Sequence, residues 1–177
     1  MQIEMTIKGL MVDPITNSPI VILRDKEGQK VLPIWVGIFE ANAIALQIEN
    51  ISTPRPMTHD LLRNVIEDLK ASVQKIVVCD LQENTFYALI YLRLNGDTLA
   101  IDARPSDAIA LAVRVRVPIY AEESVLERAG VLLDQEEASG PATEERTEVK
   151  PEELERMSAF RDFIDSLDLD DFDKRKS

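Results

Sequence analysis

The sequence predicts a globular domain that combines strands with helices, followed by a linker and a C-terminal helix. Apolar and polar residues alternate near the start, with Ile3, Met5 and Ile7 on one face, which is typical of a half-buried strand. Further along, residues 38–51 and 59–70 repeat apolar positions at helical spacing. From about residue 131 the composition shifts to acidic and polar residues, which indicates the end of the compact part.

Length and composition limit the class of protein. The chain has 177 residues, enough for one domain with a hydrophobic core and an appendage. No apolar run approaches the ~20 residues that a membrane helix needs, so we expect no membrane association. The N-terminus carries an acid and alternates, unlike a signal peptide. A single cysteine, Cys79, rules out an internal disulfide and lies among apolar residues, which predicts a buried thiol in a cytoplasmic protein.

The first half of the domain is expected to begin with strands at residues 2–12, 19–23 and 30–36. Pro33 predicts an edge position or a bulge in the third strand, because proline cannot donate a ladder hydrogen bond. Gly37 then opens a helix over residues 38–51, and its many apolar residues predict that the helix is largely buried.

The second half begins with a helix at residues 59–70, for which Thr58 is the expected N-cap. The expected buried face of this helix consists of Leu61, Leu62, Val65, Ile66 and Leu69. Strands at 74–81, 85–94 and 98–101 follow, the last two joined by a hairpin turn at Asn95-Gly96. The remaining elements are a helix to about 116, a strand at 118–120, and a helix at 122–129 that Gly130 ends.

The net charge of −12 is unevenly distributed along the chain. Residues 1–130 hold 13 Lys and Arg against 17 Asp and Glu, whereas residues 131–177 hold 7 against 15. We therefore predict a domain at 1–130, a flexible acidic linker at 131–150, and a C-terminal helix with a charged tail at 151–177. An apolar stripe on that last helix predicts docking on the domain or on another subunit. The acidity argues against nucleic-acid binding unless a local basic patch or divalent cations are present.

A charged turn joins the strand at 98–101 to the helix that follows it. Asp102 and Asp107 could bind a divalent cation, since hard cations prefer carboxylate oxygens. Arg104 could clamp a phosphate through its planar guanidinium. The alternative is a helix cap, with Ser106 as the N-cap, Asp107 favourable to the helix dipole, and Arg104 paired with Asp102.

Two further side chains are open to a functional and a structural interpretation. His59 is the only histidine and cannot build a zinc site alone, but it could act as a general base or acid. The alternative is a solvent-facing residue in a first helical turn. Glu40 is either a residue that the helix dipole favours or a metal or catalytic ligand. Phosphate-loop, dinucleotide and hydrolase-elbow motifs are absent, and we expect no organic cofactor.

Most of these candidates fall in three blocks: residues 32–41 (LPIWVGIFEA), 55–62 (RPMTHDLL) and 102–110 (DARPSDAIA). In this order the blocks resemble the signature blocks of the bifunctional nuclease domain family, which has bacterial and plant members. The resemblance covers roughly residues 2–130. It implies an α+β fold, in which several helices pack against a mixed or antiparallel sheet. It also implies a homo-oligomer and nuclease activity on RNA and DNA.

We infer roles for the block residues from their chemistry. The candidate catalytic residues are His59, Glu40, Asp60, Asp102 and Asp107, and the four carboxylates are also the candidate ligands of Mg²⁺ or Mn²⁺. The candidate substrate-binding residues are Arg55, Arg104 and Ser106. Hydrolysis of nucleic acid at such a site requires three helix starts to converge, and helix N-termini bind anions well. The alternative is a non-catalytic oligomeric module that binds a partner protein or a small anionic ligand.

Overall fold

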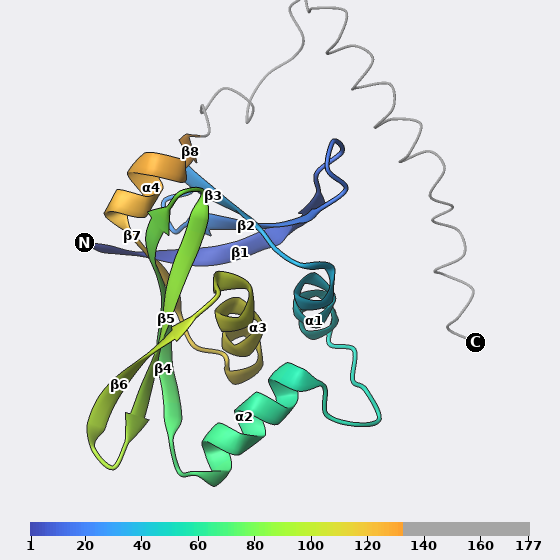
Figure 1. Ribbon diagram of the computed structural model, residues 1–177, viewed down its shortest axis with the longest axis vertical. Helices are drawn as coiled ribbons and strands as arrows, with labels where there is room; N and C mark the ends of the chain where they lie inside the picture. Colours follow the sequence, from blue (N-terminus) through green and yellow to red (C-terminus); the bar gives the residue numbers. More distant parts are fainter. Residues whose placement is uncertain (133–177) are drawn as a thin grey trace, which may run out of the picture. The chain divides into compact units, whose positions relative to one another are not determined.

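The computed structural model describes residues 1–132, which form one eight-stranded sheet and four helices (Figure 1). The strands are β1 Gln2–Val12, β2 Pro19–Asp25, β3 Lys30–Trp35, β4 Ser72–Gln82, β5 Thr85–Leu94, β6 Asp97–Ala103, β7 Ile119–Glu122 and β8 Val131–Leu132. The helices are α1 Ile38–Ile48, α2 Thr58–Asp68, α3 Pro105–Val115 and α4 Glu123–Ala129. The α+β prediction is confirmed, while the predicted C-terminal helix and nearly all of the predicted linker lie outside the described residues.

The sheet consists of two meanders that β7 joins. Its strand order is β6-β5-β4-β7-β1-β2-β3-β8, and β4 with β7 is the parallel pair among antiparallel neighbours. The β5–β6 hairpin turns at Asn95 and Gly96, whose φ angles of 52° and 93° are those of a tight hairpin turn. Among residues 1–132, β8 pairs with β3 at Lys30 and Val31 and does not reach Pro33, so Pro33 lies at the edge of the described sheet, as predicted.

Helix α3 is the centre of the core. It packs on β4 and β5 and also contacts α1 and α2, so that it lies between the sheet and the other two helices (Figure 1). Its residues Ala108 to Ala112 are almost completely buried. The small alanine side chains let neighbouring elements approach closely. This packing brings the N-terminal turn of α3 next to α1 and α2.

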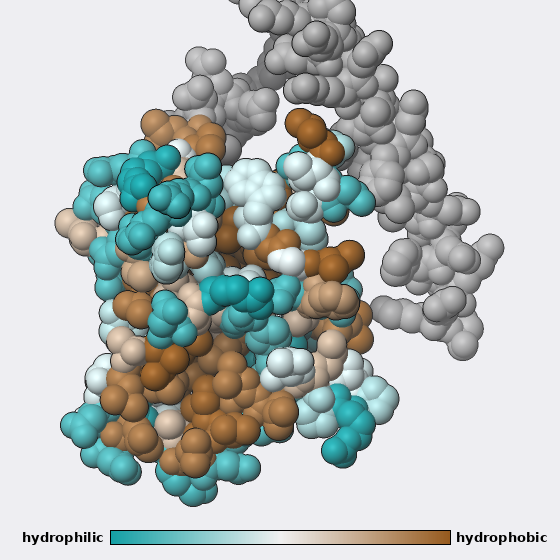
Figure 2. Space-filling model, in the orientation of Figure 1, coloured by the Kyte–Doolittle hydropathy of each residue, from teal (hydrophilic) through white to brown (hydrophobic). Residues whose placement is uncertain are grey.

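The predicted burial of α2 is wrong. Of the five apolar residues predicted to be buried only Ile66 is, while Leu61 and the C-cap residue Leu69 are 57% and 66% exposed. The reason is that α2 packs mainly on α3 and only slightly on β4, so most of its apolar stripe has no partner among the described residues. Helix α1 is likewise less buried than predicted, because Ile38 and Phe39 face solvent. Figure 2 shows apolar surface gathered over the region of α2 and β4–β6.

Both predicted N-caps are also wrong. Thr58 is the first residue of α2 and Met57 precedes it as the cap, while the Asp60 carboxylate accepts a 3.0 Å hydrogen bond from the Met57 backbone N–H. In α3 the cap is Arg104, because Pro105 takes the first helical position, which proline favours. Ser106 therefore lies inside the first turn. None of the helices among residues 1–132 is long and apolar enough to cross a membrane.

Candidate functional site

Four of the candidate side chains form one continuous chain of hydrogen bonds and ion pairs. His59 Nε2 lies 3.0 Å from Asp107 Oδ1, and Arg104 Nε donates to Asp107 Oδ2 at 2.7 Å. The same guanidinium donates through Nη2 to Glu40 Oε1 at 2.8 Å. Glu40 lies 64 residues from Arg104, and His59 lies 48 residues from Asp107, so the fold assembles the group.

The first turns of three helices meet at this chain. Glu40, His59 and Asp107 each lie in the first turn of their helix, α1, α2 and α3 respectively. Helix N-termini carry partial positive charge and unpaired backbone N–H groups, which favour bound anions. The structure therefore fulfils the requirement that these three helix starts converge.

Gly37 leaves room for the Glu40 side chain at the start of α1. The Glu40 carboxylate folds back over Gly37, and a Cβ atom at position 37 would overlap Glu40 Oε2. A larger residue at position 37 would therefore displace the end of the Glu40 side chain, which is the acceptor for Arg104. The φ angle of Gly37 is −70°, so the backbone angle itself does not require glycine.

The charges within the chain stabilise one another. Burial raises the pKa of Asp107, but hydrogen bonds from Arg104 and His59 lower it by more, so this pKa lies below its usual range. Hydrogen bonds first to Asp107 and then to Glu40 raise the pKa of Arg104. Because Asp107 is ionised at neutral pH it can only accept, so Nε2 of His59 carries the proton in this pair and Nδ1 is the other ring nitrogen.

The exposure of the side chains decreases along this chain of hydrogen bonds from Arg104 to His59. The Arg104 side chain is 66% exposed, Asp107 is 29% exposed and His59 is only 10% exposed. The interpretation of His59 as a solvent-facing residue is therefore wrong. An anion that arrives from solvent meets Arg104 first and finds the histidine behind it.

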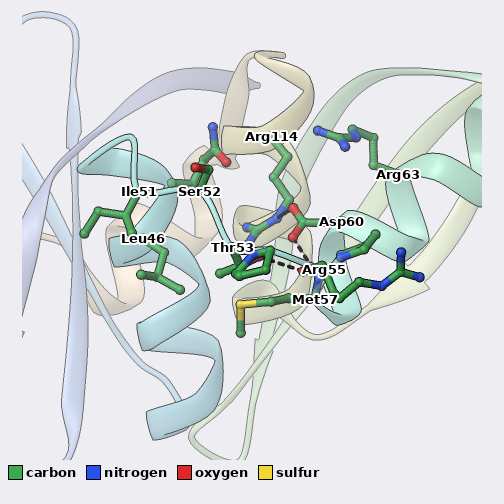
Figure 3. A pocket seen from close by; sticks show the side chains of 12 residues that line it. Leu46, Ile51, Ser52, Thr53, Arg55, Met57, Asp60, Arg63 and Arg114 are labelled. Atoms are coloured by element: carbon green, nitrogen blue, oxygen red, sulfur yellow. Dashed lines mark hydrogen bonds and ion pairs between the residues drawn. The ribbon is translucent and has the colours of Figure 1, made fainter.

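Asp60 belongs to a different pair, although it follows His59 directly. Its Oδ1 accepts a 2.7 Å hydrogen bond from Nε of Arg114, whose side chain is only 2% exposed (Figure 3). Arg114 is seven residues, or about 10 Å of helix, beyond Asp107. Both Asp60 and Arg114 line a small pocket of about 300 Å³, together with the candidate Arg55. In Figure 3 Arg55 extends away from the Asp60 carboxylate.

The remaining candidates occupy two other places. Asp102 lies on β6 opposite Leu89 and is exposed. Arg104 pairs with Glu40 and Asp107, so the predicted pair with Asp102 is wrong. Ser106 is 6% exposed and lines a second cavity together with Arg104.

Comparison with known proteins adds the family. A family model described as the bifunctional nuclease domain matches residues 21–134. The chain belongs to the bifunctional nuclease domain family. The match covers the three blocks that contain every candidate residue, so the resemblance inferred from those blocks is confirmed.

The relatives of the chain fall into two groups. It is 43% identical over 169 residues to a Mycobacterium tuberculosis protein named as uncharacterized, and the matched region covers 96% of this chain and 97% of that protein. It is 28% identical over 128 residues to bifunctional nuclease 2 of Oryza sativa subsp. japonica, covering 70% of this chain and 39% of the rice protein. Bifunctional nuclease 1 of the same rice is 25% identical over 122 residues, which is 67% of this chain and 37% of that relative.

The geometry of this family member restricts how its carboxylates could hold a metal ion. Within residues 1–132, no three His, Cys, Asp or Glu side chains are grouped as metal ligands. Arg104 binds both Glu40 and Asp107, through Nη2 and Nε, and Asp60 is held by Arg114. At most two of the candidate carboxylates can therefore act together at one ion. Mg²⁺ often binds through one or two carboxylates together with substrate phosphates.

Sequence reasoning missed Arg114, the partner of Asp60. The arginine occurs on an apolar helix, near Arg116, and no local spacing connects it to a carboxylate 54 residues earlier. Its almost complete burial required the packing of α2 on α3. Cys79 is partly buried, and this burial, with smaller contributions from Asp80 and Asp102, raises the pKa of its thiol, which disfavours the thiolate form that a nucleophile needs.

Proposed function

We propose that this protein is a nuclease that hydrolyses phosphodiester bonds of RNA and DNA at the hydrogen-bonded chain of side chains formed by Glu40, Arg104, Asp107 and His59. The observation that supports this most is the convergence of three helix N-termini on a histidine–aspartate pair with an exposed arginine. Family membership supports the same activity, since the plant relatives are named bifunctional nucleases. We place the activity in the reducing cytoplasm, which a single cysteine suits.

Each member of the chain has a chemical task in this proposal. Arg104 binds the non-bridging phosphoryl oxygens and neutralises charge as water adds to phosphorus. Nδ1 of His59 accepts the proton that the water loses, while Asp107 orients the ring and stabilises the imidazolium. The P–O ester bond breaks, and the leaving oxygen takes a proton from solvent. Glu40 accepts from Nη2 of Arg104 and so holds the guanidinium in position.

A divalent cation is a further part of the proposal. Mg²⁺ or Mn²⁺ would be held by Glu40 or Asp107 together with the phosphate of the substrate, because Mg²⁺ is often bound in this way. The cation would supply additional charge neutralisation on the phosphoryl oxygens. The cation would also offset the acidity of the whole polypeptide, whose net charge of −12 otherwise repels nucleic acid.

The deciding experiment compares the wild-type protein with His59→Gln, which keeps most of the side-chain volume. Both proteins are purified in full length and incubated with labelled RNA and single-stranded DNA in the presence of Mg²⁺ or Mn²⁺. We expect the variant to lose at least about 100-fold in cleavage rate, the size of a general-base contribution. Equal thermal unfolding of the two proteins shows that the fold is intact. A folded variant that cleaves as fast as the wild type would overturn the proposal.

The alternative is a non-catalytic module, in which the same ion pairs only connect α1, α2 and α3. It is favoured by the fact that Glu40, Asp60 and Asp107 all pair with arginines in the described chain. The same experiment separates the two, since the module predicts no cleavage by purified wild-type protein that depends on His59. Loss of stability without any nuclease activity would support the module.

We also propose a homo-oligomer in which a second copy covers the apolar face of α2 and β6. This face consists of half-exposed residues of both elements: Leu61, Val65, Leu69, Leu99 and Ile101. β6 is an edge strand of the described sheet, so its outer backbone groups can pair with another strand. Antiparallel pairing of two β6 strands about Ala100 would place Leu99 opposite Ile101 and would set no aspartate opposite another.

A further inference from the structure

A second, larger cavity adjoins the proposed site, because Arg104 is part of its lining. Its volume is about 760 Å³, against about 300 Å³ for the pocket at Asp60. It is formed by the end of β3, the β4–β5 hairpin, the start of α3 and the end of α4. The side chains that matter for the argument are Trp35, Phe86, Arg104, Ser106 and Arg128.

The cavity has aromatic walls. Trp35 is 53% exposed, and its indole Nε1 donates a 3.3 Å hydrogen bond to Asp13 Oδ2, which holds the ring by its edge. Phe86 packs partly against the hydrophobic core and is therefore also fixed in position. Exposed, immobilised aromatic rings are the platforms on which bases of single-stranded nucleic acid stack.

The charge of the cavity differs from that of the protein. Its lining in the described chain includes two arginines and no acidic residue, although the net charge of the chain is −12. Arg104 uses Nε and Nη2 for its carboxylate partners, which leaves Nη1 as a donor for another group. Arg128 is 53% exposed, and its contact to Asp80 is long, at 3.5 Å. Arginine forks beside aromatic rings match a phosphate next to a base.

Arg104 connects this cavity to the catalytic chain. The same guanidinium lines the cavity and binds Asp107, the partner of His59. We propose that the cavity receives an unpaired base of single-stranded RNA or DNA, stacked against Trp35, and thereby presents the adjoining phosphodiester to Arg104 and His59. This inference rests on the proposed nuclease function and specifies its substrate class. A base inside a duplex must first be unpaired and unstacked to enter the cavity, at a cost in free energy, so the cavity favours single-stranded over double-stranded nucleic acid.

Binding is tested on the full-length His59→Gln protein, which retains the cavity. A labelled single-stranded 12-nucleotide oligomer and its duplex are titrated by fluorescence anisotropy. We expect single-strand binding, at least 10-fold weaker duplex binding, and a loss of about 10-fold or more on Trp35→Ala, from the loss of one stacked base. Trp35→Phe should restore most of the affinity. Because Trp35 is the only tryptophan, quenching of its fluorescence by the unlabelled single strand is an independent signal.

Tyr87→Ala is the matched control, because Tyr87 is a partly exposed aromatic residue next to Phe86 that does not line the cavity. Its affinity should equal that of the parent. Unchanged affinity in Trp35→Ala, or equal affinity for duplex and single strand, would overturn the inference. If the wild type cleaves in a His59-dependent manner and Trp35→Ala leaves KM unchanged, the cavity assignment fails while the nuclease proposal stands. Trp35-dependent single-strand binding without any cleavage supports the cavity and refutes the nuclease.

Discussion

Replacing Asp107 by asparagine tests the proposed site at its central residue. Asp107 accepts one hydrogen bond at each carboxylate oxygen, at 3.0 Å from His59 and 2.7 Å from Arg104. Asparagine has nearly the same shape but offers one oxygen and one NH₂ group, so it can accept from only one of the two donors. The substitution also removes the negative charge that stabilises an imidazolium on His59.

The expected losses follow from these contacts. A hydrogen bond to a charged group contributes about 1.5–3 kcal/mol, and partial exposure of Asp107 lets water replace some of it. We therefore expect Asp107→Asn to lower the free energy of unfolding by about 1–2 kcal/mol at pH 7, or roughly 3–8 °C in Tm. Cleavage should fall much further, by about 10²–10⁴-fold, because His59 loses the group that orients it and favours its protonated form.

The assay measures both quantities on the same preparations. Cleavage of labelled RNA and single-stranded DNA gives the rate, and thermal or urea unfolding gives the stability. Asp102→Asn is the control, since it makes the same change in charge at an exposed carboxylate that is not part of the hydrogen-bonded group. We expect the control to change neither quantity measurably. A folded Asp107→Asn protein that cleaves at the rate of the control would refute the assignment of a histidine–aspartate pair to catalysis.

Three further predictions concern acid stability, metal dependence and assembly. Burial raises the pKa of Asp60, but the Met57 N–H and Arg114 lower it by more, so its contribution to stability exists above its unfolded pKa, near 3.8, and is lost as pH falls through the folded value. Asp60→Asn should therefore flatten the stability curve below about pH 4 in urea unfolding from pH 2 to 7. EDTA should abolish cleavage and added Mg²⁺ or Mn²⁺ should restore it, whereas a rate that EDTA leaves unchanged would exclude the metal. Val65→Asp combined with Ile101→Asp should convert the oligomer to a monomer in light scattering, and an unchanged mass would show that another surface holds it together.

The elements that sequence predicts well are those set by local chemistry. The strand at 85–94 matches β5, because the turn at Asn95-Gly96 fixes where it must end. The strand at 98–101 is longer in the structure, from Asp97 to Ala103, because charged Asp102 has no apolar side chain to mark it as part of a strand. Val131 and Leu132, at the start of the predicted linker, pair with β3 as β8. Two apolar residues are too few for a periodic signal.

The partners of the candidate side chains were beyond local reasoning. Glu40 and Arg104 are 64 residues apart, and His59 and Asp107 are 48 apart, so only the packing of α1 and α2 on α3 brings them together. The predicted burial of the apolar face of α2 was wrong for a related reason. Helical spacing identifies an apolar face, but it does not distinguish a face that packs within the chain from one that a second molecule can cover.

The two carboxylate–arginine pairs of α3 provide an internal comparison of structure and function. Arg114 is almost completely buried against Asp60, and a buried arginine that loses its partner destabilises the protein strongly. Arg104 is 66% exposed, and exposed ion pairs contribute little to stability. A purely structural role therefore explains the pair with Asp60 but gives little reason for the pair with Asp107. Asp60→Asn should consequently cost mainly stability and Asp107→Asn mainly cleavage, and the reverse result would reassign the site to the pocket at Arg114.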